Sequence, residues 1–322
     1  MNTDPELSQP VQELLKNIRE HFPAQITIQV DDQASGRISH DAAQQEMQKD
    51  GSMILHVYDQ TDLNYTISHE LLHLEMYLKG FPAMGLPVTT SDPHLDDQIA
   101  ATGVAIYNSA SHLIIGAEQR RNGIITKETE QAFIRGISDV VPAEEPNADQ
   151  GDDPRFFYRV LTLLDGLAFF ADHEDSLPAE WLQMYPEAFK YAQRLYATMT
   201  AKVIDSPFAL RRAIVKTFRD FDAMLDELGY MPMPHDQFVA LSPVLSERQT
   251  KLEFRQVFDI LHTDYLNRET KEKAFLAIGK SDRQMAFALP LKELSQDAAL
   301  KIYDQKAADI LKQFQIGYAL RN

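Results

Sequence analysis

The chain has no cysteine among its 322 residues. This absence excludes disulfide bonds, thiolate nucleophiles, iron–sulfur clusters and zinc sites with cysteine ligands. It is compatible with a cytoplasmic location, which we predict. The N-terminal segment MNTDPELSQP has neither a basic nor an apolar stretch, and no run of eighteen apolar residues occurs in the chain. We therefore expect no secretory signal and no membrane-spanning segment.

Positive charge is also scarce. The chain has 31 Lys and Arg against 48 Asp and Glu, which gives a formal net charge of −17. Residues 1–150 hold 9 basic and 23 acidic side chains, whereas residues 151–322 hold 22 and 25. Neither half has the excess of cations that binding to a phosphate backbone requires, so we predict that the protein binds no nucleic acid. The excess of acidic side chains in residues 1–150 is typical of a solvated surface.

Apolar residues make up 44% of the chain, enough to build a globular core, and their spacing predicts an α+β fold. The N-terminal part is expected to contain strands at 25–30 and 52–60 and helices at 11–22, 40–49, 61–80 and 92–115. Beyond Arg155 the helical period dominates, and we expect helices and no strand there: 155–171, 185–203, 207–228, 246–262, 268–278 and 294–314. The acidic, proline-bearing segment 140–154 is the best linker candidate.

From these elements we predict a small mixed sheet packed on the helix at 61–80. A catalytic domain would span residues 1–140, and an α-helical domain or extension would span residues 155–322. The chemistry of the second part is not evident from its residues.

One short motif carries recognisable chemistry: His69-Glu70-Leu71-Leu72-His73, an HExxH sequence in the helix at 61–80. Two residues four apart on a helix differ by about 6 Å along the axis and about 40° around it, so both imidazoles can reach one ion. Zinc accepts such nitrogen ligands at about 2.0–2.1 Å. Glu70 lies beside the two ligands and can take a proton from water that the metal activates. The motif therefore predicts a zinc site with a general base.

The stretch from Ser68 to Glu75, with a strand before it, resembles the zincin metallopeptidases. The resemblance covers about residues 25–120, and it implies a small mixed sheet, a single zinc ion and hydrolysis of peptide bonds. The extended metzincin pattern is absent, because Met76 and Lys79 stand where its glycine and third histidine would be. A third ligand further along the chain is typical of gluzincin-like families, and the chain more weakly resembles the minimal cytoplasmic proteases of the ImmA/IrrE type.

A catalytic zinc ion normally has three protein ligands and a water molecule. Four residues are candidates for the third ligand: His112, Glu118, His94 and Asp97. We favour His112, because it lies opposite the apolar stripe of its helix, on a face that also carries Ala101 and Ala105. If His112 is the ligand, its ring should lie within about 4–7 Å of the rings of His69 and His73, since such sites are largely preformed.

The sequence thus favours a soluble, cytoplasmic zinc peptidase in which His69, His73 and His112 hold the metal and Glu70 is the general base. Its partner would be a peptide or protein substrate. One alternative is a zinc hydrolase that acts on another amide or a small molecule. The other is a regulatory or scaffold protein with a non-catalytic metal site, which would be closed to water.

Overall fold

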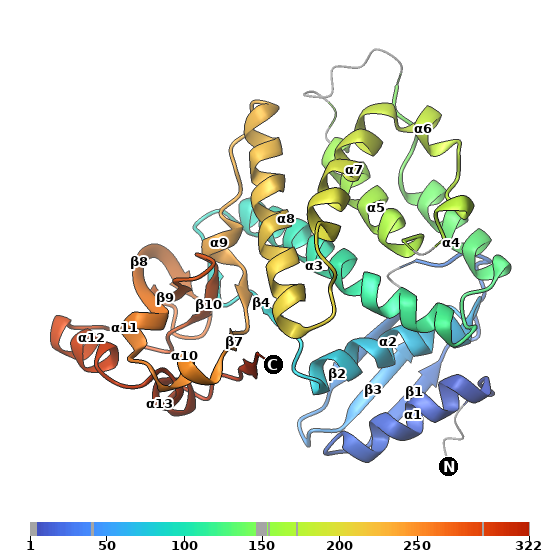
Figure 1. Cartoon of the computed structure of the whole chain (residues 1–322). Coiled ribbons are helices and arrows are strands. Elements are labelled where there is room, and N and C mark those ends of the chain that lie inside the picture. Colours follow the sequence, from blue (N-terminus) through green and yellow to red (C-terminus); the bar gives the residue numbers. More distant parts are fainter. Residues whose placement is uncertain are drawn as a thin grey trace. The chain divides into compact units, whose positions relative to one another are not determined.

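The computed structural model describes residues 5–39, 42–145, 153, 155–171, 173–291 and 293–321. The fold is α+β, as predicted. The chain forms two compact units (Figure 1). Unit 1 consists of Met1–Lys79 and Ser111–Gln193, and unit 2 consists of Gly80–Ala110 and Arg194–Asn322. Most of the predicted linker, residues 146–152 and 154, lies outside the described residues.

Unit 1 contains a three-stranded sheet in the order β1-β3-β2 (Figure 1). Strand β1 (Ile26–Val30) pairs in parallel with β3 (Met53–Val57), and β2 (Ala43–Met47) pairs with β3 in the antiparallel sense. Helix α2 (Leu63–Leu78) packs on β2 and β3 and contacts α1 (Gln9–His21). The sheet and α1 therefore support the helix that carries the HExxH motif.

The ends of α2 follow from local chemistry. Its first turn is capped by Asp62, whose side chain accepts a hydrogen bond of 3.0 Å from the backbone N–H of Tyr65. The helix ends before Gly80, which has φ of 77°, a backbone conformation that favours glycine. The spacing of Ile67, Leu71, Leu74 and Leu78 predicts a buried stripe. The first three are buried along one face and fix the rotation of the helix, whereas Leu78 at the end of the helix is exposed.

The remaining helices of unit 1 are α4 (Lys127–Val140), α5 (Phe156–Phe169), α6 (Trp181–Met184) and the first part of α7 (Pro186–Thr200), with a short 3₁₀ turn at Glu174–Ser176. Two glycines permit close packing here. A Cβ on Gly136 would lie 1.8 Å from the carbonyl oxygen of Ile38, and one on Gly166 would lie 2.7 Å from the ring of Trp181. Any larger residue at either position would force these segments apart.

Helix α3 (Pro93–Arg121) is shared, since its residues up to Ala110 belong to unit 2 and those from Ser111 belong to unit 1. Within the described residues it is the one helix long and apolar enough to span a membrane, but 56% of its apolar window is buried inside the protein. Burial of this kind is also expected of a core helix.

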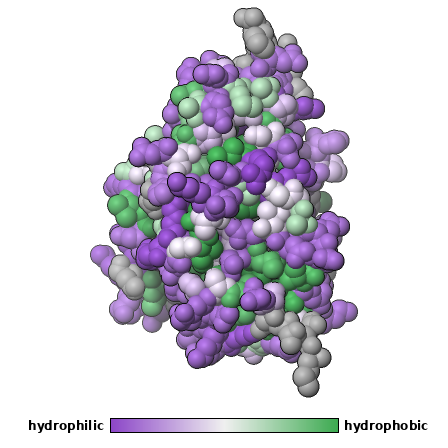
Figure 2. Space-filling model, turned by 90° about the vertical axis from the view of Figure 1, so that its right-hand side faces the viewer, coloured by the Kyte–Doolittle hydropathy of each residue, from purple (hydrophilic) through white to green (hydrophobic). Residues whose placement is uncertain are grey.

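On the face that Figure 2 shows, hydrophilic residues cover most of the surface, with small apolar areas between them.

Unit 2 contains the short strands β4 (Met84–Gly85) and β5 (Val88–Thr89), and it continues after α7 with helices α8 (Pro207–Glu227) and α9 (His235–Phe238). Its main sheet has the order β10-β9-β8-β5. The three long strands are β8 (Phe258–Asn267), β9 (Lys273–Gly279) and β10 (Met285–Ala288). Two short pairs complete the unit: β4 with β6 (Ala240–Leu241), and β7 (Val244–Leu245) with β11 (Ala319–Leu320).

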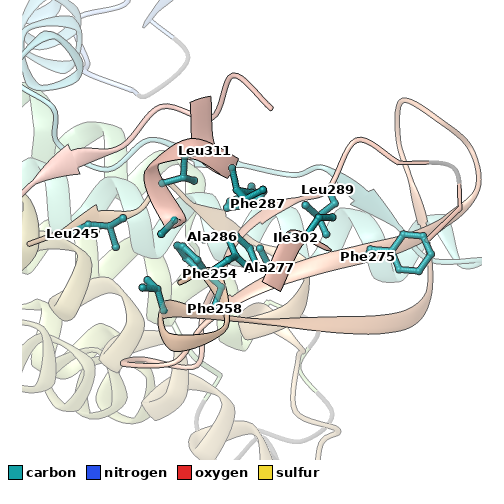
Figure 3. Close-up of a cluster of buried hydrophobic side chains, with 13 residues drawn as sticks. Leu245, Phe254, Phe258, Phe275, Ala277, Ala286, Phe287, Leu289, Ile302 and Leu311 are labelled. Carbon is teal, nitrogen blue, oxygen red and sulfur yellow. The ribbon is translucent and has the colours of Figure 1, made fainter. Parts of the chain in front are cut away.

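Short helices cover one part of this sheet and enclose a cluster of buried apolar side chains (Figure 3). They are α10 (Glu247–Lys251), α11 (Phe254–Val257), α12 (Gln296–Tyr303) and α13 (Ala307–Gln313). Leu245, Phe254 and Phe258 contribute to the cluster from β7, α11 and β8. The predicted helix at 294–314 is thus present as two shorter helices.

Three of the predicted helices are wrong. Residues 43–47 of the predicted helix 40–49 form strand β2, the predicted helix 246–262 is replaced by α10, α11 and the first part of β8, and the predicted helix 268–278 contains β9. The expectation that no strand follows Arg155 is therefore also wrong. In each case pairing with a neighbouring strand decides the structure, because local preference is a weak constraint once a segment is buried in a sheet.

Candidate metal centre

Three histidines of unit 1 converge. The ring centroids of His69 and His73 are 4.8 Å apart, and those of His112 lie 4.6 Å from His69 and 5.4 Å from His73. One ring nitrogen from each histidine can be chosen so that all three lie within 4.8 Å of one another. The proximity predicted for His112 is confirmed, while its role as a metal ligand stays a prediction.

The spacing of the two motif histidines fits a tetrahedral metal. Their Nε2 atoms are 3.2 Å apart. Two nitrogens that each lie about 2.0–2.1 Å from zinc at the tetrahedral angle are separated by about 3.3 Å. Two imidazole nitrogens at this distance either share a proton or bind the same ion. The donor set, three neutral nitrogens on two helices, therefore suits zinc, which binds imidazole readily.

Asp165 on α5 fixes the orientation of His112. Its Oδ1 lies 2.5 Å from the Nδ1 of His112, and both side chains are buried. A hydrogen bond at Nδ1 leaves Nε2 as the nitrogen for a metal, the arrangement in which a carboxylate orients a histidine ligand and makes it more basic. The close contact between Gly166 and Trp181 holds this turn of α5 in place.

Glu70 is also held. The Nε2 of Gln45 donates one hydrogen bond of 2.9 Å to a carboxylate oxygen of Glu70 and another of 3.0 Å to its backbone carbonyl. Gln45 lies on β2, in register with Leu55 on β3, so the sheet positions the carboxylate. Glu70 is half-buried and is not among the three grouped ligands. This is the placement expected of a general base beside a metal.

A second amide joins the two helices that carry the histidines. Gln119 on α3 is 1% exposed, and its Nε2 donates to the carbonyl of Tyr65 at 3.0 Å and to the Oγ of Ser68 at 2.9 Å, both on α2. Burial, and to a smaller extent the charge of Asp165, raises the pKa of the Tyr65 phenol, whose ring centroid is 5.6 Å from that of His69. Tyr65 therefore stays protonated at neutral pH.

The other three candidates for the third ligand are not part of this group of histidines. Glu118 makes an ion pair with Arg121 and accepts a hydrogen bond of 2.8 Å from Asn122. His94 and Asp97 are exposed near the beginning of α3, in the part that belongs to unit 2. Within the described residues, the group formed by His69, His73 and His112 is the only set of three that could share an ion.

Three residues that support the site have no signal in the sequence: Gln45, Gln119 and Asp165. Gln45 lies 25 positions from Glu70, in a segment whose composition favours a helix, and Asp165 lies 53 positions from His112. Neither follows a fixed spacing.

Comparisons with protein-family models, curated proteins and solved structures find no match for the chain. The assignment of function therefore depends on the residues and their geometry.

Proposed function

We propose that the protein is a zinc-dependent peptidase, with His69, His73 and His112 as metal ligands and Glu70 as the general base. The observation that supports this most strongly is the third imidazole. His112, 39 residues after His73 in the chain, lies against the HExxH pair at distances suited to one ion. A cytoplasmic location remains a prediction.

The residues divide the chemistry between them. The three imidazoles would hold a zinc ion, which would supply a Lewis acid that polarises a carbonyl and makes water more acidic. Glu70, held by Gln45, accepts a proton from the water whose oxygen attacks the carbonyl carbon. It then delivers that proton to the amide nitrogen as the carbon–nitrogen bond breaks. Asp165 keeps the His112 ring in the orientation that presents Nε2.

Glu70→Gln tests the proposal directly. Metal analysis of the purified protein should find one zinc per chain in both the wild type and the variant, because Glu70 is not a ligand. Cleavage of a mixed peptide library, followed by mass spectrometry, should slow by about 10²–10⁴-fold in the variant. Glu75→Gln is the matched control, since Glu75 is on the same helix and pairs with Lys79 at 2.8 Å.

Two outcomes would contradict the proposal. A protein that binds no zinc would exclude the metal site. Peptide cleavage that is equally fast with Glu70→Gln would exclude the assigned base. Zinc binding without cleavage of any peptide would reject the peptidase and favour the scaffold alternative, and hydrolysis of small amides alone would favour the other alternative.

A further inference from the structure

Unit 2 contains a cavity of about 280 Å³ that shares no residue with the candidate metal centre. One wall is helix α8, and another is the turn that follows β9, at Gly279–Asp282. The segment Pro243–Leu245, Gln249 of α10 and the junction of α11 with β8 complete the lining. The cavity is slightly smaller than the usual size range of small-molecule sites.

The floor of the cavity is apolar and rigid. Leu245, Val257 and Phe258 line it and are also members of the buried cluster of unit 2; Figure 3 labels Leu245 and Phe258 within that cluster. Val215 of α8 adds a further buried side chain. A ligand that fills the space would therefore bury apolar atoms against a surface that is already packed from behind.

Besides Arg211, three further cations of α8 line the same cavity: Arg212, Lys216 and Arg219. Their spacing of four and three residues places them on one side of the helix. Among the described residues, none of the three makes an ion pair with a carboxylate. Arg212 and Arg219 donate instead to the backbone carbonyls of Val203 and Asp282.

The acidic residues nearby are engaged with other groups. Asp282, the one carboxylate in the lining, accepts a hydrogen bond of 2.8 Å from the Nε of Arg211, and that pair is formally neutral. Asp220 of α8 pairs with Arg194, and Asp222 pairs with His235. The lining therefore carries three more positive than negative charges, in a chain whose net charge is −17; outside the lining, the carboxylate of Asp236 attracts Arg219.

We propose that this cavity binds a small organic phosphate, with the phosphate group at Arg212, Lys216 and Arg219 and an apolar portion against the floor. Charged hydrogen bonds from arginine to phosphate are among the stronger polar contacts, and lysine adds a compact charge. A doubly charged phosphate matches three cations better than a single carboxylate does. This inference is independent of the proposed peptidase activity.

Phenyl phosphate is a suitable probe, because it combines a phosphate with one apolar ring. Calorimetric titration of the full-length protein at low salt should show saturable binding at one site, with a dissociation constant on the order of millimolar, as expected for a fragment-sized ligand. Binding should weaken as salt is raised. Lys216→Gln and Arg212→Gln should each weaken it by about tenfold.

Lys301→Gln is the matched control, since Lys301 is exposed on helix α12 and does not line the cavity. It should bind phenyl phosphate as the wild type does, and thermal melting should show that all three variants are folded. The proposal is overturned if phenyl phosphate shows no saturable binding, or if Lys216→Gln and Lys301→Gln bind it equally. Equal affinity for benzoate would reject phosphate as the ligand class, and equal affinity for inorganic phosphate would reject a role for the apolar floor.

Discussion

Each unit buries a histidine whose Nδ1 meets a carboxylate, and the two histidines differ at the other nitrogen. His112 in unit 1 has Asp165 at 2.5 Å from Nδ1, and its ring faces His69 and His73. His235 in unit 2 has Asp222 at 3.1 Å from Nδ1 and the hydroxyl of Thr102 at 2.8 Å from Nε2. A carboxylate beside a histidine is thus common to both sites.

The difference shows which histidine has a structural role. His235 is fully buried, stacks on Phe218 with ring centroids 4.9 Å apart, and has protein partners at both nitrogens. Its ring therefore has a packing role in unit 2. Three imidazoles that meet, as in unit 1, instead provide several electron pairs at one point, and such an arrangement suits a cation.

Removal of His112 and removal of His235 should change different properties of the protein. The largest effect is expected on zinc affinity, when His112 is removed. His112→Ala should lower zinc affinity by about 100-fold or more, because a zinc binding free energy of about 10–16 kcal/mol is shared by about four ligands. Competition with a chromogenic chelator measures this. His94→Ala is the control on the same helix, and a larger loss with His94→Ala would transfer the ligand role to that residue.

His235→Ala should leave zinc affinity unchanged and destabilise the protein instead. Loss of a fully buried ring creates a cavity and removes a partner from Asp222, so we expect a cost of about 3 kcal/mol in the free energy of unfolding. Urea unfolding measures it. Loss of zinc from His235→Ala, with stability intact, would invalidate the distinction between the two histidines.

Asp165→Asn tests whether the carboxylate beside His112 supports metal binding. The amide keeps the shape of the side chain but removes the charge that makes His112 a better ligand, so zinc affinity should fall by about 10–100-fold. The free energy of unfolding without metal should change much less. Unchanged zinc affinity would mean that Asp165 is a packing partner of His112, as Asp222 is of His235.

The smallest effect is expected beside His235. Burial and the charge of Asp222 raise the pKa of Asp236, so the folded state binds this proton more tightly than the unfolded state. Its contribution to stability is therefore present at low pH and is lost as the pH rises through the folded pKa. Asp236→Asn should stabilise the protein at pH 7 by a few tenths of a kcal/mol, since solvent screens a partly exposed group.

The advantage of Asp236→Asn should shrink towards pH 4, where the wild-type carboxyl takes up its proton. Urea unfolding at the two pH values measures the change. A variant that is less stable than the wild type at pH 7 would show that attraction of the ionised carboxylate to Arg219, together with its backbone hydrogen bond, outweighs its burial and its repulsion by Asp222.

The predicted helices succeeded where an apolar stripe runs along a long segment. The sequence located α2 between a cap at Thr61 or Asp62 and a stop at Gly80, and the helical period located α5 and α8. It failed at β2, where alanine, glutamine and glutamate favour a helix but β3 supplies a partner strand. It also failed at β9, an almost continuous buried run, because periodicity does not distinguish such a strand from a buried helix.

At the candidate site, the sequence predicts residues that are close together in the chain better than residues that are far apart. His69, Glu70 and His73 lie on one turn, so their spacing alone predicts that they converge. His112 was predicted because it lies opposite the apolar stripe of α3, and the structure has it beside the motif. Gln45 and Asp165 depend on how β2 and α5 pack, and no local pattern in the sequence specifies that packing.

Residues 80–110 of unit 2 interrupt unit 1, and this interruption has a consequence for synthesis on the ribosome. His69 and His73 are synthesised before residues 74–164, and Asp165 is added only after them. At about 5–20 residues per second, translation takes roughly 5–20 seconds to cover that interval. During this time the nascent chain has its first two imidazoles but not the carboxylate that orients the third. If the three histidines bind a metal as proposed, the complete site would form late in synthesis, after α5 has been made.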